Sequence, residues 1–514
     1  MLRAGLAGMA AAAVAVGFAE LVGAIVGVSV VAAVGGLVID LQPPGAKDLM
    51  VSLFGESDKL ALEVGVVAGG VAVGGLLGVV GRRDVRLASA GLVIFGLIAY
   101  MLALRDPLAS PLIAVLPVGA AVGVGLWLLP RLLSASAEKD APVSKLDSAE
   151  PAVAEQIRPG PLGRRSFVAL AAGLIAGGGL MALAGRLAGS QPQTVGDGPP
   201  LPIASQTLPP LPAAADFGLE GLTPIVVHEP DFYRIDTRLS VPRIDAATWR
   251  LRIHGMVARE LTLSYDELLE QPLIERYVTI ACVSNNVGGY LVGNARWTGT
   301  LLRPLLERAG VEAAASQIVG RSFDGWTAGF PTAHLDGAGA ESMITVAMNG
   351  EPLPAQHGYP ARLIVPGLYG YVSATKWLTE IEMTTLDGFD AYWVPLGWAK
   401  EAPILTQSRI DLPRAGAPLV AGPVETAGVA WAPTRGISRV EVQLDDGAWL
   451  PAELSLALAD TAWVQWRLIV EVPAGEHVLR VRATDGAGET QTERRTPPAP
   501  DGARGYHERR IRAA

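Results

Sequence analysis

The chain is 514 residues long; half of its residues are hydrophobic, only 18% are charged, and its mean hydropathy is +0.34. Soluble globular proteins are about 25% charged, so we expect part of this chain to lie in lipid. The formal net charge of −9 argues against a nucleic-acid-binding protein, which would carry a basic stripe. The single cysteine, Cys282, excludes intrachain disulfides, iron–sulfur clusters held by this chain and CxxCH attachment of haem.

Five apolar stretches precede residue 190, and each is long enough to cross a bilayer, which takes about 20 residues. They span 4–38, 60–80, 87–104, 111–129 and 167–187. Any one of them could be a buried helix of a soluble protein. Five in succession, joined by short charged loops, favour an all-α transmembrane bundle. The first is overlong, so we expect either one tilted span or a span followed by a re-entrant piece.

Basic residues set the expected orientation of these spans in the cell membrane. Arg82, Arg83 and Arg86 separate the second and third stretches. The residues between the fourth and fifth stretches include Arg131, Lys139, Lys145, Arg158, Arg164 and Arg165. Because cytoplasmic loops are enriched in Lys and Arg, we expect both loops and the N-terminus to be cytoplasmic. Everything after residue 187 is then extracytoplasmic.

The membrane part offers little chemistry of its own. All six histidines follow the fifth stretch, so we expect no haem in this chain. Glu20 and Glu63 are isolated in the sequence and do not form pairs spaced like a proton relay. We therefore expect this part to anchor the protein or to dock a partner rather than to transport a solute.

Changes in composition predict the domain boundaries. The predicted segments are a four-span region at 1–130, a cytoplasmic linker at 131–165, a fifth span at 166–188, a Pro/Gly/Ala-rich extended tether at 189–216, a mixed domain at 217–415 and a strand-rich domain at 416–514. Strand-like alternation mixed with short helical patterns at 265–269 and 301–309 indicates an α+β domain. Strands at 428–431, 440–444, 463–470 and 477–483 predict a small all-β sandwich.

Cys282 stands where a strand-like run, 277–281, gives way to a loop rich in Ser, Asn and Gly. A lone cysteine is commonly a small buried hydrophobe. A thiolate at the end of a strand can instead project into a cleft and bind a soft or borderline transition metal. As a nucleophile it would need a base, and His357 is the one histidine in a suitable context.

A second candidate segment runs from Met348 to Trp377. Asn349-Gly350 predicts a tight turn, and Pro360 fixes the chain before a strand. The segment is compatible with ordinary surface turns. However, His357, Arg362 and Lys376 fall near turns at strand ends, where their cationic or donor groups could converge on a phosphate.

Together these residues resemble the sulfite oxidase family of molybdenum-cofactor oxidoreductases, in its membrane-anchored bacterial form. The resemblance covers about 232–507, and its markers are Phe232-Tyr-Arg-Ile-Asp-Thr237 with Pro242, Cys282, Asn294-Ala-Arg-Trp297, the Asn-Gly-x-Pro-Leu…His-Gly-x-Pro-x-Arg run and Lys376-Trp377. It implies an α+β molybdopterin domain followed by an immunoglobulin-like dimerisation domain, and hence a possible homodimer.

The resemblance implies a cofactor of molybdenum with a single pyranopterin, with Cys282 as the metal ligand. The residues that it implies around the pterin and its phosphate are Tyr233, Arg234, Asp236, Thr237, Asp324, His357, Arg362, Ala374, Thr375 and Lys376. A negatively charged cofactor needs buried cations and backbone donors, because an uncompensated buried charge is costly.

Two departures from the family concern the substrate. Val346 stands where the sulfite-oxidising members have a tyrosine, and 284–287 lacks the arginines that follow their cysteine. We expect a substrate less anionic than sulfite, or one bound by other residues such as Arg296, which we assign to catalysis, Lys400 or Arg409. The aromatic run 392–398 could form a pocket wall or be core.

Gly163-Arg-Arg-Ser-Phe-Val-Ala-Leu, before the fifth stretch, resembles a twin-arginine export signal placed internally. Ordinary positive flanking of a span is the alternative. Twin-arginine export moves folded proteins, as a domain loaded with its cofactor in the cytoplasm would require.

We therefore expect two-electron oxygen-atom transfer on a small oxyanion, S-oxide or N-oxide, in either direction, with electrons passing through a separate cytochrome or quinone-linked membrane protein. The alternatives are a non-catalytic membrane-anchored sensor or binding protein on a degenerate fold, and a hydrolase that uses Cys282 and His357.

Overall fold

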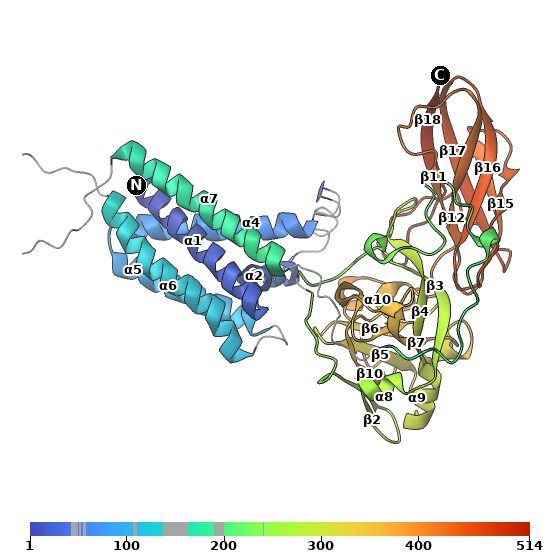
Figure 1. Cartoon of the computed structure of the whole chain (residues 1–514), viewed down its shortest axis with the longest axis horizontal. Coiled ribbons are helices and arrows are strands. Elements are labelled where there is room, and N and C mark those ends of the chain that lie inside the picture. Colours follow the sequence, from blue (N-terminus) through green and yellow to red (C-terminus); the bar gives the residue numbers. More distant parts are fainter. Residues whose placement is uncertain are drawn as a thin grey trace, which may run out of the picture. The chain divides into compact units, whose positions relative to one another are not determined.

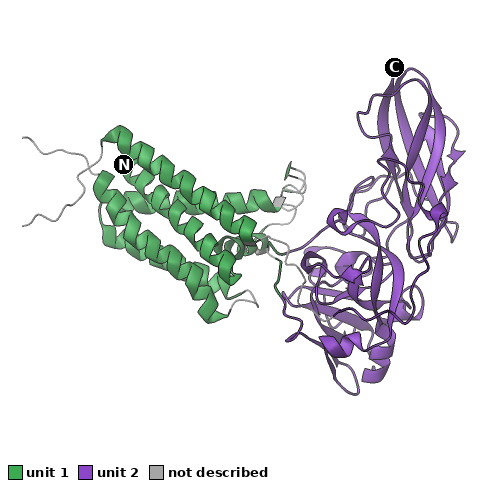
Figure 2. Ribbon diagram, viewed as in Figure 1, with its two compact units in different colours: residues 1–191, 238–243 green, residues 192–237, 244–514 purple. Residues whose placement is uncertain are grey.

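The computed structural model describes residues 1–42, 50, 53–54, 58–105, 110–136, 163–189, 200–239 and 241–514. The chain divides into two compact units, one of residues 1–191 and 238–243 and one of residues 192–237 and 244–514 (Figure 2). Most of the linker predicted at 131–165, with Lys139, Lys145 and Arg158, lies outside the described residues, and so does the first part of the predicted tether.

The first unit is helical (Figure 1). Its helices are α1 (Leu2–Val26), α2 (Val30–Asp40), α4 (Asp58–Gly81), α5 (Val85–Ala103), α6 (Pro111–Ser136) and α7 (Arg164–Gly189). Among the described residues, five helices, all of these except α2, are long and apolar enough to cross a membrane. The overlong first stretch is one long helix followed by a short one, since the chain turns at Gly27 and the Ser29 side chain caps α2 by accepting from Ala32 N.

Close backbone approach holds this unit together. Helix α1 contacts α4, α6 and α7. A Cβ added to Gly8 would lie 2.0 Å from the carbonyl oxygen of Gly74, and one added to Gly17 would lie 2.3 Å from that of Gly178. Small residues at such crossings let apolar helices pack tightly where lipid offers no hydrophobic driving force.

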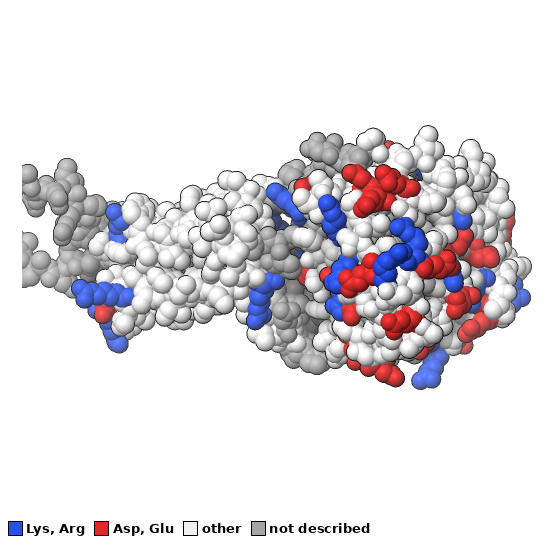
Figure 3. Space-filling view, turned by 90° about the horizontal axis from the view of Figure 1, so that it is seen from below, with Lys and Arg blue, Asp and Glu red and all other residues white. Residues whose placement is uncertain are grey.

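The described arginines of the two predicted basic loops lie at one end of the helical unit. Ala7, Ala88, Leu132 and Phe167 belong to one buried cluster, which joins the beginnings of α1, α5 and α7 to the end of α6. The arginines at 82, 83, 86, 131, 164 and 165 neighbour these positions in the chain. In the view of Figure 3 the middle of this unit shows almost no charge.

The prediction that Glu63 is isolated is wrong. Its carboxylate, near the beginning of α4, forms an ion pair with Arg186 near the end of α7. Glu20 accepts hydrogen bonds from Ser29 Oγ at 2.7 Å and Val31 N at 2.9 Å. These contacts join different helices, so the spacing of residues in the sequence does not predict them.

The second unit contains two mixed-domain sheets. One has the order β2-β1-β10-β5-β6, in which β1 and β10 are parallel and the other neighbours antiparallel; its strands are β1 (Arg250–Gly255), β2 (Leu261–Ser264), β5 (Gln317–Ser322), β6 (Thr327–Pro331) and β10 (Leu378–Thr384). The other has the order β3-β4-β7-β8, with β9 paired to β7; its strands are β3 (Leu273–Ala281), β4 (Val292–Leu301), β7 (Met343–Met348), β8 (Glu351–Pro352) and β9 (Arg362–Ile364).

Short helices connect these strands. The α-helices are α8 (Tyr265–Leu269), α9 (Leu302–Ala309) and α10 (Gly370–Ser373), and the 3-10 helices are η2 (Ala213–Ala215), η3 (Glu229–Asp231), η4 (Thr332–Asp336), η5 (Ala355–His357) and η6 (Val394–Leu396). Ser264 and Glu267 form a capping box that begins α8, and Gly310 ends α9 in a left-handed conformation. The two predicted helical patterns are confirmed.

The C-terminal part consists of two four-stranded antiparallel sheets. Their strands are β11 (Gln407–Leu412), β12 (Gly422–Trp431), β15 (Glu453–Leu454) and β16 (Val464–Val472) in one, and β13 (Ile437–Leu444), β14 (Leu450–Pro451), β17 (Gly475–Asp485) and β18 (His507–Ala513) in the other. Inward side chains of both sheets share one hydrophobic cluster.

The C-terminal sheets include a strand that lies before the predicted boundary at residue 416. Strand β11 pairs with β12, so the C-terminal sheets begin near residue 407. Trp431 and Trp463 also lie in the same buried cluster as Trp297 of β4. The mixed domain and the C-terminal sheets therefore share a hydrophobic core, which explains why they form one compact unit.

The predicted tether contains no helix at 200–212, and its residues 205–208 lie along β3. Ser205 N donates to the carbonyl oxygen of Leu273 at 2.8 Å, and Leu208 N donates to Glu275 Oε2 at 2.8 Å. Its backbone groups thus find hydrogen-bond partners on a strand, as buried backbone groups require, and the tether ends in the 3-10 helix η2.

Candidate molybdopterin site

Cys282 directly follows β3, and the pairing with β4 continues past the strand because Cys282 N donates to the carbonyl oxygen of Leu291 at 2.9 Å. We call residues 282–291 the cysteine loop. Side chains alternate along a strand, so Cys282 follows Val278 and Ile280 onto one face of the sheet. The loop is closed by a hydrogen bond from Leu291 N to Asn285 Oδ1 at 2.9 Å.

Aromatic rings line this face of the sheet. The Phe232 ring stacks on Tyr233 with centroids 5.3 Å apart, and it meets the rings of Trp297 and His357 edge-on at 5.8 and 5.7 Å. A Cβ on Gly293 would lie 2.6 Å from the Phe232 ring. Burial raises the pKa of Tyr233 far above its usual range, and the nearby Cys282 acts in the same direction.

Arg362 is a buried cation on the same face. Its guanidinium carbon lies 4.9 Å from the centroid of Trp297, and Nη1 donates to the carbonyl oxygen of His357 at 3.0 Å. Its Nε is buried without a hydrogen-bond partner, and within the described residues no carboxylate pairs with it. Burial lowers the pKa of Arg362 to about 10, so it stays charged at pH 7.

Three further buried groups in this neighbourhood have no hydrogen-bond partner: Thr375 Oγ1, Ser322 Oγ and Trp326 Nε1. Thr375 Oγ1 would lie 2.5 Å from a Cβ on Gly320 of β5. The backbone of Phe323, beside Ser322, donates to the carbonyl oxygen of Trp377 at 2.7 Å. Buried donors without partners are costly, so this cluster is suited to a ligand rich in acceptor atoms. Sequence reasoning missed Ser322 and Trp326.

His357 is neutral in this setting. Burial lowers its pKa to about 4, and the neighbouring Arg362 acts in the same direction. Its Nε2 lies 3.4 Å from the carbonyl oxygen of Glu229. The next residue, Gly358, has φ +112°, and a Cβ there would lie 3.0 Å from Lys376 Cα and 3.1 Å from Arg362 Cβ. Glycine therefore lets the two basic residues approach each other.

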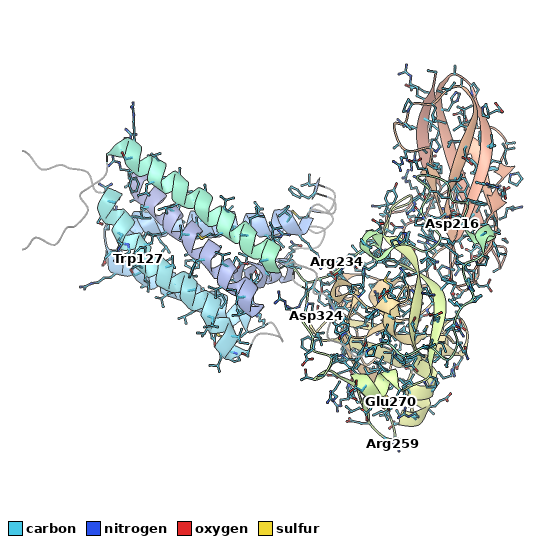
Figure 4. The ribbon with its side chains drawn as sticks, viewed as in Figure 1. Trp127, Asp216, Arg234, Arg259, Glu270 and Asp324 are labelled. Carbon is cyan, nitrogen blue, oxygen red and sulfur yellow. The ribbon has the colours of Figure 1, made fainter. Side chains whose placement is uncertain are left out.

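Lys376 forms an ion pair with the buried carboxylate of Asp236, which also accepts from Arg234 Nε at 2.6 Å. Lys376 Nζ donates to the carbonyl oxygen of Gln356 at 3.2 Å as well. In Figure 4 the labelled Arg234 and Asp324 lie at the same edge of the domain. Asp324 Oδ1 accepts from Trp326 N at 3.1 Å and so holds its own turn.

The structure thus brings together Tyr233, Arg234, Asp236, His357, Arg362, Thr375 and Lys376. Ala374 ends α10 with its N–H donating to Gly370 O at 2.9 Å, and Thr237 follows Asp236 directly. Arg296 is placed differently: it stands next to Trp297 in β4 and faces the other side of the sheet, 3.8 Å from Glu275.

Tyr369 is a third residue that sequence reasoning did not assign to the site. Burial raises its pKa to about 12, and Cys282 and Arg504 are among its electrostatic neighbours. Its hydroxyl would lie 2.6 Å from a Cβ on Gly502, in the C-terminal part. Tyr369 therefore lies near Cys282 and contacts the segment around Gly502, more than a hundred residues later in the chain. No local sequence pattern predicts this contact.

These residues fit molybdopterin: Arg362 is a buried cation without a carboxylate partner, aromatic rings lie beside it on the face that Cys282 shares, and three buried donors without partners lie in and beside β5. The profile of the family described as oxidoreductase molybdopterin binding domain matches residues 238–393. The uncharacterized oxidoreductase YuiH of Bacillus subtilis is 34% identical over 155 residues, which cover 30% of this chain and 74% of that protein. The chain belongs to the sulfite oxidase family of molybdopterin oxidoreductases.

Other members of this family resemble longer parts of the chain. Mitochondrial sulfite oxidase of Homo sapiens is 29% identical over 310 residues, covering 50% of this chain and 56% of that protein. NADH nitrate reductase 1 of Oryza sativa subsp. japonica is 26% identical over 342 residues, which cover 53% of this chain and 36% of that protein. The chain thus spans only about half the length of the human sulfite oxidase.

The fold is shared with a solved structure. The sulfane dehydrogenase SoxCD from Paracoccus pantotrophus superposes with a TM-score of 0.50 at 23% identity, covering 57% of this chain and 82% of that one. At this identity the likeness concerns the fold alone. The family membership makes this chain an enzyme of the molybdopterin-dependent oxidoreductase type.

Proposed function

We propose that this chain is a membrane-anchored oxidoreductase that transfers an oxygen atom to or from a small, weakly charged substrate such as an S-oxide or N-oxide. The observation that carries the proposal is the unpaired guanidinium of Arg362, buried on the face that Cys282 shares. A lone buried cation is unfavourable unless an anion neutralises it. The phosphate of molybdopterin is such an anion.

The chain's own residues would divide the work of holding this cofactor. Cys282 would ligate the metal through its thiolate, as a borderline transition metal prefers. Arg362, Thr375 and Lys376 would hold the phosphate and the polar end of the pterin, and neutral His357 would donate one hydrogen bond. Tyr233 would pack against the pterin. When bound, the molybdenum centre supplies two-electron oxygen-atom transfer.

The charges around the site support a weakly charged substrate. Each cation that could replace the missing arginines of the cysteine loop has a carboxylate nearby: Arg296 lies 3.8 Å from Glu275, Lys400 2.7 Å from Asp390 and Arg409 2.7 Å from Asp411. A paired cation attracts a second anion much less. This favours the neutral substrates over a sulfite-like oxyanion, and gives Arg296 no catalytic role in the proposal.

The hydrolase alternative fits the site poorly. A cysteine nucleophile needs a base that accepts its proton near neutral pH, whereas burial lowers the pKa of His357 to about 4. The Nε2 atom of the histidine ring lies 3.4 Å from the carbonyl oxygen of Glu229. The family membership supports an enzyme and so disfavours the alternative of a non-catalytic sensor.

We further infer that the helical unit anchors the enzyme in the cell membrane with the oxidoreductase part outside the cytoplasm. The support is the gathering of six arginines at one end of the helices, because cytoplasmic ends are enriched in basic residues. Electrons would pass to or from a separate cytochrome or quinone-linked membrane protein. The C-terminal sheets would form an immunoglobulin-like dimerisation domain.

The substrate class can be tested on purified, cofactor-loaded protein with one dye electron donor and one dye acceptor. We expect reduction of neutral S-oxides or N-oxides with the donor and no saturable oxidation of sulfite with the acceptor. Saturable sulfite oxidation would contradict the proposed substrate class. Absence of any dye-linked activity from protein that contains molybdenum would contradict the oxygen-transfer proposal.

A further inference from the structure

The cysteine loop is held from outside its own domain. Arg409, on β11 of the C-terminal sheets, donates from Nη1 to the carbonyl oxygen of Gly289 at 3.0 Å. Its guanidinium carbon also lies 4.5 Å from the centroid of the Tyr290 ring. Two consecutive residues of the loop are therefore bound by one side chain from the C-terminal sheets.

Arg409 is itself firmly held. Its Nε donates to Asp411 Oδ1 at 2.7 Å, and Nη2 donates to Thr223 Oγ1 at 2.7 Å. Arg409 is only 1% exposed, and the Asp411 side chain is 5% exposed. A buried, charge-paired guanidinium has few alternative rotamers, so its hydrogen bond to Gly289 fixes the position of this part of the cysteine loop.

His507 touches the loop one residue earlier. As the first residue of β18, it accepts through Nδ1 from the backbone N–H of Ile410 at 2.9 Å. The opposite edge of its ring lies against Gly288, where an added Cβ would be 2.3 Å from His507 Cδ2. Gly288 has φ +78°, a conformation that favours glycine. No side chain fits between the loop and the ring.

The two contacts are linked through β11. The residue that donates to His507, Ile410, is the neighbour of Arg409 in the strand. The two ends of the loop are joined, next to the ladder of β3 and β4, by the hydrogen bond from Cys282 N to the carbonyl oxygen of Leu291. Residues 288–290 directly precede Leu291, so the C-terminal sheets hold the segment to which the backbone of Cys282 is hydrogen-bonded.

We propose that Arg409 and His507 are positioning residues through which the C-terminal sheets set the placement of the Cys282 thiol. This inference rests on the proposed role of Cys282 as the metal ligand. The orientation of a metal ligand affects the properties of the metal that it binds. Residues that orient the ligand therefore influence the metal without contacting it. The C-terminal sheets are in this view part of the metal site.

The test compares four variants of the full-length chain in detergent: Arg409→Gln, His507→Asn, Tyr290→Leu and, as the control, Arg435→Gln. An asparagine oxygen can still accept from Ile410 N–H, but it lacks the ring that packs on Gly288. Arg435 also belongs to a C-terminal ion pair, 2.8 Å from Asp485, and has no contact with the cysteine loop among the described residues.

The first readout is amide hydrogen exchange of residues 282–291 in protein made without cofactor. We expect exchange about tenfold faster in Arg409→Gln, the factor expected when roughly one charged hydrogen-bonded contact is lost from a local opening equilibrium. In His507→Asn, which loses only the packing of the ring on Gly288, we expect a smaller increase. Tyr290→Leu, whose side chain is 60% exposed, keeps the fold intact and should show a smaller increase. Exchange equal to that of the Arg435→Gln control in all three variants would overturn the inference.

The second readout is the electron paramagnetic resonance spectrum of the partly reduced, cofactor-loaded protein. We expect shifted or broadened signals in Arg409→Gln and His507→Asn at unchanged molybdenum content, and a wild-type spectrum in the control. Unchanged spectra in both variants would overturn the positioning role. Absence of molybdenum from the wild-type protein would instead refute the proposed function, and the exchange experiment would still decide whether the loop is held as described.

Discussion

The guanidinium of Arg362 lies 4.9 Å above the ring of Trp297, and its buried Nε donates to no other group in the described chain. Trp297 donates its own Nε1–H to the carbonyl oxygen of Val278 at 3.1 Å, so the ring beneath the cation is fixed by the strand that leads to Cys282. A cation–π contact contributes about 2 kcal/mol when desolvated. It therefore offsets only part of the cost of burying a charge without a counterion.

The first prediction follows from this imbalance. Arg362→Met should make the cofactor-free protein more stable by about 1–4 kcal/mol, because it removes an uncompensated buried charge. The same change should abolish retention of molybdopterin. Thermal unfolding in detergent and pterin analysis measure the two effects. Arg409→Met is the matched control: it leaves Asp411 buried without its cation and should destabilise the protein instead. Loss of stability in Arg362→Met with retention of pterin would contradict the assignment.

The second prediction concerns pH. Burial lowers the pKa of His357 to about 4, and burial likewise lowers that of His507 to about 4, against about 6.5 when unfolded. Between pH 4 and pH 6.5 the unfolded state binds more protons than the folded state. The contribution of these histidines to the free energy of unfolding is therefore fully present above pH 6.5 and decreases as the pH falls toward 4. His357→Gln should flatten this dependence by up to about 1.4 kcal/mol per pH unit. Unfolding of cofactor-free protein at several pH values measures it; an unchanged slope would show that His357 titrates normally.

The third prediction tests the glycine between the two basic residues. Gly358→Ala should destabilise the protein and reduce its molybdenum content, because the new Cβ would crowd both Lys376 and Arg362 at a φ of +112°. Gly397→Ala is the control, since Gly397 has a φ of +97° but nothing within 4 Å of its added Cβ. Both changes carry the backbone strain of about 1–3 kcal/mol. Only the first should affect the metal, and equal molybdenum contents would contradict the crowding argument.

The fourth prediction concerns export. If the segment beginning at Gly163 directs folded export, replacing Arg164 and Arg165 together by lysine should leave the oxidoreductase part in the cytoplasm while keeping the positive charge. Protease protection of the C-terminal domain in intact cells and spheroplasts measures its location. Replacing Arg82 and Arg83 by lysine is the matched control and should change nothing. Unchanged export in the first variant would show that these arginines only flank a span.

Local patterns predicted the elements that depend on local physics. The apolar stretches are helices, the structure expected of about twenty consecutive apolar residues that cross a bilayer. Residues 265–269 form a helix because Ser264 and Glu267 cap it. The position of Cys282 at the end of a strand followed from the change from alternation to a polar loop.

Contacts between distant segments were beyond such patterns. The pairing of Glu63 with Arg186, the start of the C-terminal sheets at β11 and the contact of Tyr369 with the C-terminal part each join residues far apart in the chain. The face of Arg296 was missed for a related reason. Its neighbour Trp297 occupies the cofactor side, and strand alternation sends Arg296 to the other side.

The central claim, that the Cys282 thiolate binds the metal of a pterin held by Arg362, is tested most directly by elemental analysis of two proteins purified side by side from a host that makes molybdopterin. The wild-type chain should contain about one molybdenum atom per chain. Its X-ray absorption spectrum should show a metal–sulfur contribution from one protein thiolate. Cys282→Ser should fold with the same unfolding temperature, retain pterin and lose that thiolate signal with most of the metal. Wild-type protein without molybdenum, or a Cys282→Ser variant with the wild-type absorption spectrum, would contradict the account.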